Sequence, residues 1–354
     1  MTTPDMTDLL AVLARGRSLS EDEAAAAFEI IMTGHATDAQ IGALLGAMQA
    51  RPEGPTIDEI VGAARVMRRH AAGIDLPPGL EVIDTCGTGG DASGTFNIST
   101  AAALIAAGAG ARVAKHGNRS VTSNSGSSQV LQALGVNLEV DGPTHGLCLE
   151  QAGLCFCFAP AHHPAMKHAV GPRKELGFRT IFNVLGPLTN PAGARRQVLG
   201  VFESRLTETI AAVLQRLGAL HAMVVHGQTP AAPDTTHGGL GLDELTTTGP
   251  TRITVLKDDA LETSELHPAD LGLAAASVEQ LRIADVDASA SVIRAVLDGE
   301  PGPARDIASL NAAAALVVAD LASDLKQGLD KARESLDAGA AKRSLEKLVE
   351  LTNA

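Results

Sequence analysis

The stretch GTGGDASGTFNIST, residues 87–100, is rich in glycine and in other small residues. Four glycines fall within its first eight residues, and hydroxyl and amide side chains follow. Glycines after a strand let backbone N–H groups approach an anion closely, and the N-terminus of a following helix adds partial positive charge. The stretch therefore predicts a phosphate-binding loop. The alternative is a tight turn that only glycine can make.

A dinucleotide site is the competing interpretation of the same loop, because Gly87, Gly89 and Ala92 satisfy the pattern G-x-G-x-x-A. Three features disfavour it. The Asp91 carboxylate would face a bound pyrophosphate, the helix is expected to begin only near Ser99, and the next strand is expected to end at a lysine where an acid should bind the ribose. The nucleotide-triphosphate motif G-x-x-x-x-G-K-[ST] does not occur in the sequence.

A second candidate loop begins at KHGNR, residues 115–119, and continues to SNSGSS, residues 123–128. We expect Lys115 at the end of a strand, where its ammonium can serve as a point charge for phosphate while serine and glycine supply hydrogen bonds. Solvated surface charge is the alternative for Lys115 and Arg119. Two loops of the same kind after successive strands favour phosphate binding.

The adjacent acids Asp243 and Glu244 form a third candidate loop, in a glycine-flanked turn. Mg²⁺ is typically held by one or two carboxylates together with substrate phosphates and water. The acid pair and the two phosphate-type loops together predict a metal-bound diphosphate. A solvated acidic loop is the alternative for the pair taken alone.

The elements that must position these loops can be predicted from hydrophobic periodicity and capping signals. Residues 1–75 have three capping-box spacings and are predicted to be a small all-helical domain. The segment AGIDLPPG, residues 72–79, is typical of a linker. From residue 76 to 354 we expect a large α/β domain, with 162–185 as helices that could complete the small domain.

Short apolar runs alternate with helical patterns in the large domain, which favours a mainly parallel sheet with helices on both faces. The expected strands are residues 81–86, 111–117, 136–140, 154–160, 197–202 and 221–227. The sheet pattern weakens beyond Gly241, and amphipathic helices are expected over 309–322 and 324–339. Ligands bind such sheets at the carboxyl ends of the strands, where all three candidate loops lie.

Composition limits the partners. The 354 residues include 28 Lys and Arg against 41 Asp and Glu, and a net charge of −13 disfavours nucleic acid. Four cysteines and a start without signal-peptide character lead us to expect a reducing cytoplasm. The longest apolar stretches are too short to span a membrane. With no Trp or Tyr, the core is expected to be aliphatic and rich in alanine.

Taken together, GTGGD, NIST, KHGNR, SGSS, HHPAMKHAVGPRKELGFRTIFNVLGPLTNP, GLDEL and LNAAAALVV resemble the anthranilate phosphoribosyltransferase family. The resemblance covers nearly the whole chain. It implies a small helical domain and a large α/β domain of the nucleoside phosphorylase and phosphoribosyltransferase type, a homodimer, and Mg²⁺ as cofactor. It also implies transfer of the phosphoribosyl group of phosphoribosyl diphosphate (PRPP) to the amine of anthranilate, in tryptophan biosynthesis.

The resemblance also implies roles for individual residues. Those implied to bind PRPP are Gly87, Thr88, Gly89, Gly90, Asp91, Thr95, Asn97, Ser99, Thr100, Lys115, Ser123 and Ser127. Those implied to bind anthranilate are Gly87, His116, Asn118 and Arg173. Those implied to hold Mg²⁺ are Ser99, Asp243 and Glu244. Lys115, Asn118 and Arg173 are the residues expected to support catalysis, and a planar guanidinium suits a benzoate carboxylate because it forms two parallel hydrogen bonds.

Two departures from the family pattern are visible. The segment from Gln228 to Gly241 is longer than the usual link to the acid pair, and Asn124 and Gln129 replace the residues expected in the SGSS region. Two rival functions remain open at this point: a nucleoside phosphorylase of related architecture, and a non-catalytic relative that binds nucleic acid. KHGNR and NIST disfavour the first, and the acid pair and negative net charge disfavour the second.

Overall fold

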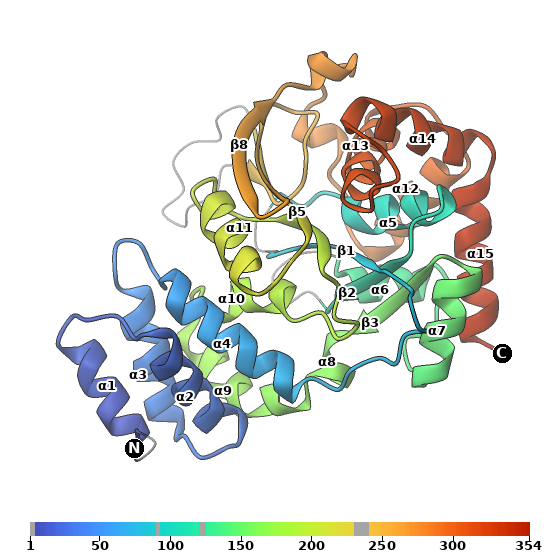
Figure 1. The fold of residues 1–354 in the computed structure, drawn as a ribbon. Helices are drawn as coiled ribbons and strands as arrows, with labels where there is room; N and C mark the ends of the chain where they lie inside the picture. Colours follow the sequence, from blue (N-terminus) through green and yellow to red (C-terminus); the bar gives the residue numbers. More distant parts are fainter. Residues whose placement is uncertain (1–3, 90–92, 120–124, 230–240) are drawn as a thin grey trace.

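The computed structural model describes residues 4–89, 93–119, 125–229 and 241–354. Its N-terminal part is a helical bundle that lies at one end of a molecule whose centre is a sheet with helices on both faces (Figure 1). The bundle contains α1 (Met6–Ala14), α2 (Glu21–Met32), α3 (Asp38–Gln49) and α4 (Ile57–His70). The three predicted capping boxes are present, at the starts of α2, α3 and α4.

The sheet is mainly parallel, as predicted. Its strands are β1 (Ile83–Gly87), β2 (Val113–Gly117), β3 (Leu154–Phe158), β4 (Arg196–Gly200), β5 (His221–Gln228), β6 (Gly241–Leu242), β7 (Thr251–Lys257) and β8 (Ala260–Leu266). Within the described residues the strand order is β3-β2-β1-β4-β5-β7-β8, and β6 pairs with β5. Strands β1 to β5 pair in parallel, whereas β6, β7 and β8 are antiparallel additions. The carboxyl ends of β1, β2, β4 and β5 therefore meet at one edge.

Helices cover the sheet on both faces. They are α5 (Ile98–Gly108), α6 (Ser127–Ala133), α7 (Gly142–Gln151), α11 (Leu206–Arg216), α12 (Val286–Leu297), α13 (Pro303–Val318), α14 (Leu325–Asp337) and α15 (Ala340–Thr352). Four short elements, α8 (Ala159–His162), α9 (Lys167–Leu176), α10 (Phe182–Leu185) and the 3-10 turn η2 (Gly186–Leu188), account for the predicted short helices between 162 and 190. No helix in the described part of the chain is both long and apolar enough to cross a membrane.

The strand expected over residues 136–140 is wrong. Val136 and Leu138 are buried, but this described stretch is an irregular connection between α6 and α7. Gly135 ends α6 with a φ of 101°, and the Asn137 side chain accepts a hydrogen bond from the backbone of Glu139. Local bonding of this kind competes with pairing to a neighbouring strand.

The sheet continues beyond Gly241, where the sequence pattern weakened. Strands β7 and β8 form a hairpin whose turn residues Asp258 and Asp259 both have positive φ, which suits the right-handed twist of a hairpin. The amphipathic helix predicted over residues 309–322 corresponds to α13, which ends at Val318 and has no exposed face over most of its length. Every residue of α13 from Ile307 to Val318 is buried, because this helix lies between the sheet, α5 and α14.

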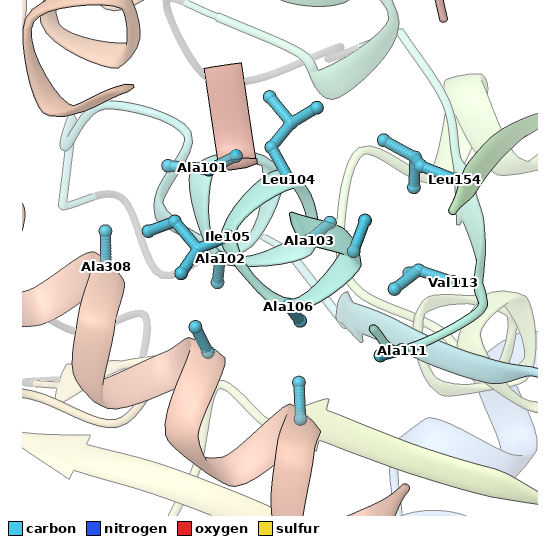
Figure 2. Close-up of a cluster of buried hydrophobic side chains, with 14 of the residues drawn as sticks. Ala101, Ala102, Ala103, Leu104, Ile105, Ala106, Ala111, Val113, Leu154 and Ala308 are labelled. Carbon is cyan, nitrogen blue, oxygen red and sulfur yellow. The ribbon is translucent and has the colours of Figure 1, made fainter. Parts of the chain in front are cut away.

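The larger core is rich in alanine, as predicted. Helix α5 is almost wholly buried, and Ala102 and Ala106 leave room for α13 to approach closely, with Ala308 on the facing helix (Figure 2). On its other side lie Val113 and Leu154 from β2 and β3 (Figure 2). Close packing of small side chains fixes α5, and its N-terminus then points at the carboxyl edge of the sheet.

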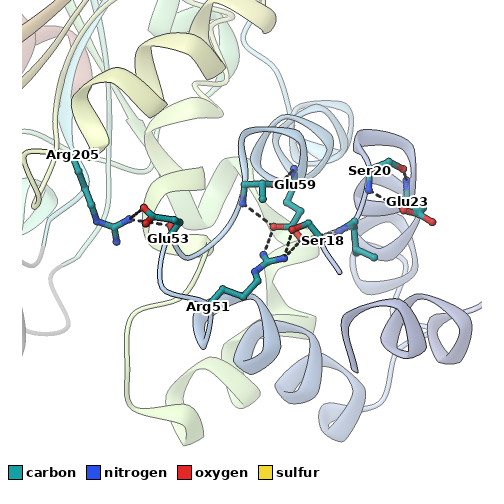
Figure 3. A network of polar contacts seen from close by, with 9 residues as sticks. Ser18, Ser20, Glu23, Arg51, Glu53, Glu59 and Arg205 are labelled. Atoms are coloured by element: carbon teal, nitrogen blue, oxygen red, sulfur yellow. Dashed lines mark hydrogen bonds and ion pairs between the residues drawn. The ribbon is translucent and has the colours of Figure 1, made fainter. Parts of the chain in front are cut away.

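The helical bundle and the opposite face of the sheet share the second core. Side chains of α1–α4 pack with those of α9, α10, β4, β5 and α11. Polar contacts reinforce the bundle: Arg51 pairs with the fully buried Glu59, and Arg205, just before α11, donates to the backbone of Glu53 at 3.0 Å (Figure 3). The bundle is therefore attached to the sheet through α11.

Candidate active site

The glycine-rich loop leaves β1 at the edge where the strands end. Thr88 donates its backbone N–H to Gly200 O at 2.9 Å, and its hydroxyl accepts from the backbone of Phe202 at 3.1 Å. Gly89 has a φ of 67° and donates its N–H to Asp243 Oδ2 at 2.7 Å. The loop is thus attached to β4 on one side and to the acid pair on the other. Gly90 and Asp91 lie outside the described residues.

The N-terminus of α5 carries the second half of the same motif. The helix begins at Ile98, one residue earlier than expected, with Asn97 as its N-cap residue. Ser99 donates its backbone N–H to Glu244 Oε1 at 3.0 Å, and the hydroxyl of Ser99 accepts from Lys115 Nζ at 3.1 Å. Thr100 is fully buried, and its hydroxyl has no partner in the described part of the chain. Thr95 forms an isolated bridge with Arg282.

Lys115 lies within β2 rather than at its end, which corrects the predicted position. Only 1% of the residue is exposed, and its ammonium donates to Thr85 O as well as to Ser99. Asp84, on the adjacent strand, is fully buried and accepts from the backbone of His116 at 3.1 Å. Burial raises the pKa of Asp84, while Asn190 and the Lys115 ammonium act against that rise. Lys115 is therefore a fixed positive charge beneath the start of α5.

The acid pair rests on glycines at the ends of three neighbouring strands. Gly87 and Gly200 are paired in register, and a Cβ at either position would meet Asp243, at 2.3 Å from Oδ2 and 1.5 Å from the backbone oxygen respectively. A Cβ at Gly227 would come within 2.6 Å of Glu244 O. We name Gly87, Gly200 and Gly227 the glycine floor. Because these residues lack side chains, the backbone of the acid pair can lie directly on the sheet edge.

The chemistry of this edge suits a hard cation. Two carboxylates and the Ser99 hydroxyl are gathered at the N-terminus of α5, and all three offer the oxygen ligands that Mg²⁺ prefers. The described residues contain no group of three or more His, Cys, Asp and Glu around one point. Among the described residues, Asp243, Glu244 and Ser99 are the ones whose oxygens could hold a cation at this edge.

The second phosphate-type loop is joined to the first through Asn97. The Asn97 side chain donates to Ser125 O at 3.2 Å and accepts from the hydroxyls of Ser125 and Ser289 at 2.5 and 2.9 Å. Ser127 begins α6, and its hydroxyl donates to Asn118 O at 3.5 Å. The predicted neighbourhood of these two loops is therefore present. Ser123 lies outside the described residues.

Buried histidines line the other side of β2. Ring centroids of His116 and His163 are 5.1 Å apart, and His116 donates to the backbone carbonyl of Gly186. Burial and the neighbouring histidines lower the pKa of His116 to about 3 and that of His163 to about 4, so both rings are neutral near pH 7. His116 Nε2 and His163 Nε2 have no hydrogen-bond partner in the described residues. His162 instead donates to Ala72 O in the linker.

Arg173 and Asn118 complete the set of predicted acceptor residues. Arg173 lies near the end of α9, and its guanidinium carbon is 4.9 Å from the centroid of Phe182 in α10. Burial lowers its pKa, but a guanidinium remains charged in proteins. The α10–η2 segment thus connects Arg173 with His116, because Phe182 in α10 contacts Arg173 and the backbone carbonyl of Gly186 accepts a hydrogen bond from His116. Asn118 is exposed, and its side-chain oxygen accepts from the backbone of Arg119 at 2.7 Å.

Sequence reasoning missed several residues that support the site. They are Asp84, His163 as a partner of His116, Gly200 and Gly227, and Asn311, whose amide bonds to Leu245 beside the acid pair. A glycine at the end of a buried strand can be recognised in the sequence as a place where another backbone could approach. Which segment approaches it depends on the order of the strands in the sheet, which the sequence does not show.

Comparison with known proteins now identifies the family. Residues 79–342 match a model described as "Glycosyl transferase family, a/b domain", and residues 7–71 match "Glycosyl transferase family, helical bundle domain". The chain is 51% identical over 348 residues to anthranilate phosphoribosyltransferase of Thioalkalivibrio sulfidiphilus, covering 98% of this chain and 99% of that protein. This chain belongs to the anthranilate phosphoribosyltransferase family.

Solved structures of anthranilate phosphoribosyltransferases have the same architecture. The protein from Thermus thermophilus superposes with a TM-score of 0.89 at 39% identity, covering 98% of this chain and 100% of that one. The Saccharomyces cerevisiae protein in complex with PRPP and Mg has a TM-score of 0.86 at 27% identity, covering 100% and 99%. The resemblance predicted from the loop motifs and the predicted fold class are confirmed.

Proposed function

We propose that this protein transfers the 5-phosphoribosyl group of PRPP to the amine of anthranilate and releases diphosphate, in tryptophan biosynthesis. The observation that carries the proposal is the convergence of the glycine-rich loop, the start of α5 and the acid pair at one sheet edge. Such an edge suits a sugar diphosphate with its cation, and the T. sulfidiphilus protein named for this activity is 51% identical.

On the diphosphate side, the proposed work of the protein is to stabilise negative charge as the leaving group departs. Backbone N–H groups of the glycine-rich loop and of the α5 N-terminus are preorganised hydrogen-bond donors. Lys115 adds a fixed positive charge beneath them through Ser99. Asp243, Glu244 and Ser99 would hold Mg²⁺, which when bound neutralises charge on the diphosphate. The Saccharomyces cerevisiae relative in complex with PRPP and Mg supports Mg²⁺ as the cation.

On the acceptor side, the proposed work is positioning. The amine of anthranilate is a weak nucleophile, so holding it close to C1 of the ribose contributes more than activating it. Arg173, held against Phe182, would bind the carboxylate with two parallel hydrogen bonds, and Asn118 would assist. His116 is neutral and offers the lone pair of a buried Nε2 to which the amine can donate. A pKa of about 3 makes it a poor general base near neutral pH.

The reaction can be tested by following anthranilate fluorescence with purified protein. Because the sequence lacks Trp and Tyr, the protein contributes little background. The proposal expects the signal to disappear only when PRPP and Mg²⁺ are both present. Phosphorolysis of a pyrimidine nucleoside without any anthranilate turnover would overturn it in favour of the phosphorylase alternative.

Three broader expectations belong to the same proposal. The chain is divided into a small helical domain, residues 1–75, and a large PRPP-binding domain, residues 76–354. Packing of α9 and α10 against α2, α3 and α4 supports assigning residues 162–185 to the helical domain. The protein acts as a homodimer in the cytoplasm, and light scattering after size exclusion checks the dimer against a monomer mass of 36.2 kDa.

A further inference from the structure

Asn311 is a polar residue in an otherwise apolar part of α13. Its neighbours on the helix are alanine and leucine, every residue from Ile307 to Val318 is buried, and Asn311 itself is 3% exposed. Burial of an amide side chain is unfavourable unless its donor and acceptor atoms are hydrogen-bonded. The position therefore requires specific partners.

Those partners belong to the segment that carries the acid pair. Asn311 Oδ1 accepts from Leu245 N at 3.0 Å, and Asn311 Nδ2 donates to Leu245 O at 2.8 Å. The same amide group donates to Ile307 O at 2.9 Å, one turn earlier in α13. Two bonds to the backbone of one residue fix its orientation as well as its position, as pairing in a sheet does.

Leu245 directly follows Glu244, so the anchored backbone is that of the acid pair itself. The glycine floor limits the segment from the sheet side, and Thr246, the next residue, donates its backbone N–H to Thr251 Oγ1 at 3.0 Å. Asn311 supplies the contact from α13. The backbone that presents Asp243 and Glu244 is thus held between the strand ends and a buried helix.

Helix α13 also supports the other half of the cation-binding edge. It packs along α5, whose N-terminal Ser99 donates to Glu244 Oε1 at 3.0 Å. A single buried helix therefore sets the positions of both the acid pair and the α5 N-terminus. Small displacements at a ligand site have large effects on affinity because the bound geometry is narrow.

We propose that Asn311 is a positioning residue for the metal-binding acids: it touches no substrate, and its two hydrogen bonds to Leu245 set the affinity of the site for a divalent cation with diphosphate. The inference rests on the proposed function in one respect, namely that Asp243 and Glu244 face the cation. It assigns a role to a residue outside the three loops.

The test compares Asn311→Ala with Ser309→Ala. Ser309 lies two residues earlier on α13, is 1% exposed, and its hydroxyl has no partner in the described residues, so its replacement perturbs the same buried helix without touching Leu245. The probe is Mn²⁺ with inorganic diphosphate, followed by electron paramagnetic resonance, because Mn²⁺ accepts the same oxygen ligands as Mg²⁺. We expect binding about 10-fold weaker in Asn311→Ala, the loss associated with one or two buried hydrogen bonds, and wild-type binding in Ser309→Ala.

Asn311→Ser is the second variant, for use if the alanine variant does not fold by circular dichroism. A serine in a helix can donate to the carbonyl four residues earlier, here Ile307 O, but is too short to bind Leu245. It should show the same weakened Mn²⁺ binding while the KM for anthranilate stays within about twofold of wild type. Wild-type Mn²⁺ affinity in a folded Asn311 variant would overturn the inference.

Failure of the proposed function would look different. If wild-type protein binds Mn²⁺ with diphosphate but never consumes anthranilate, the proposed reaction is wrong, while the ratio of affinities between Asn311→Ala and Ser309→Ala still decides the role of Asn311. If anthranilate is consumed and that ratio is one, the reaction stands and the positioning role is wrong.

Discussion

The two sides of the candidate site are built from different materials. The diphosphate side, which we propose binds PRPP and its cation, uses backbone groups, the small residues of the glycine floor and a pair of carboxylates at the ends of parallel strands. The acceptor side, which we propose binds anthranilate, uses large side chains, His116, His163 and Arg173, carried by β2 and by the short helices and turns that follow β3. One side is specified by close backbone approach, and the other by side-chain packing.

This difference predicts which substitutions should reduce activity most. At Gly200 and Gly227 an added methyl group cannot be accommodated, because the nearest atoms it would meet are backbone oxygens of the acid pair. On the acceptor side, truncated side chains leave the backbone in place and remove only the contact. We therefore expect the largest losses from the smallest substitutions, at the glycine floor.

Gly200→Ala should have the largest effect. The added Cβ would lie 1.5 Å from the backbone oxygen of Asp243, so the acid pair must move or the strand must distort. Overpacking of this kind costs about 1–3 kcal/mol of stability, and we expect kcat/KM for PRPP to fall by more than about 100-fold. Steady-state kinetics and thermal unfolding provide the two measurements.

Gly46→Ala in α3 is the matched control, since nothing lies within 4 Å of the position that its added methyl group would take, and alanine favours a helix. It should retain activity and gain slightly in stability. A fully active Gly200→Ala protein would show that the acid pair does not need the glycine floor.

Arg173→Ala should have the next largest effect, and it should divide the two substrates. Loss of a charge-assisted pair of hydrogen bonds predicts a KM for anthranilate about 10- to 100-fold higher with little change for PRPP. Lys174→Ala, at the neighbouring exposed position on α9, is the control. Equal losses for both substrates would remove Arg173 from the acceptor side.

The smallest effect concerns stability against pH. His163 has a folded-state pKa of about 4, below the unfolded value of about 6.5, so its stabilising contribution is complete above pH 6.5 and is lost as the pH falls toward 4. His163→Gln should therefore flatten the acid slope of the unfolding free energy by up to about 1.4 kcal/mol per pH unit. Denaturant unfolding at pH 7, 6, 5 and 4.5 measures that slope.

Exposed His267 provides the control variant, His267→Gln, for loss of a histidine elsewhere. An acid slope in His163→Gln as steep as that of wild type would show that the ring is not held neutral by its surroundings. The acceptor side would then be more polar than its packing indicates.

Local features on both sides of the candidate site could be predicted from the sequence alone. Capping boxes place the bundle helices, and glycine and hydroxyl residues mark the ends of β1 and β2, because these signals act within a few residues. The β7–β8 hairpin was missed because β8 is exposed almost throughout, so it lacks the alternation of buried and exposed residues that marks a strand.

Contacts between distant segments could not be predicted in the same way. The glycine floor depends on β1, β4 and β5 being neighbours in the sheet, and the burial of Lys115 depends on β2 lying beside β1. Asn311 had a local signal, an amide within an alanine-rich apolar run, but its partner Leu245 is 66 residues away. Strand order and helix packing decide such contacts, and neither is set by local propensity.

The central claim is that Asp243 and Glu244 present a cation to the diphosphate at the glycine floor. It is tested most directly by calorimetric titration of PRPP with and without Mg²⁺, on wild type and on the double variant Asp243→Asn with Glu244→Gln. The control replaces another adjacent acid pair, Asp258 and Asp259 in the β7–β8 turn, by asparagine. We predict that Mg²⁺ tightens PRPP binding in wild type and control, and that this dependence vanishes in the Asp243 and Glu244 variant. Wild-type Mg²⁺ dependence in that variant would contradict the account.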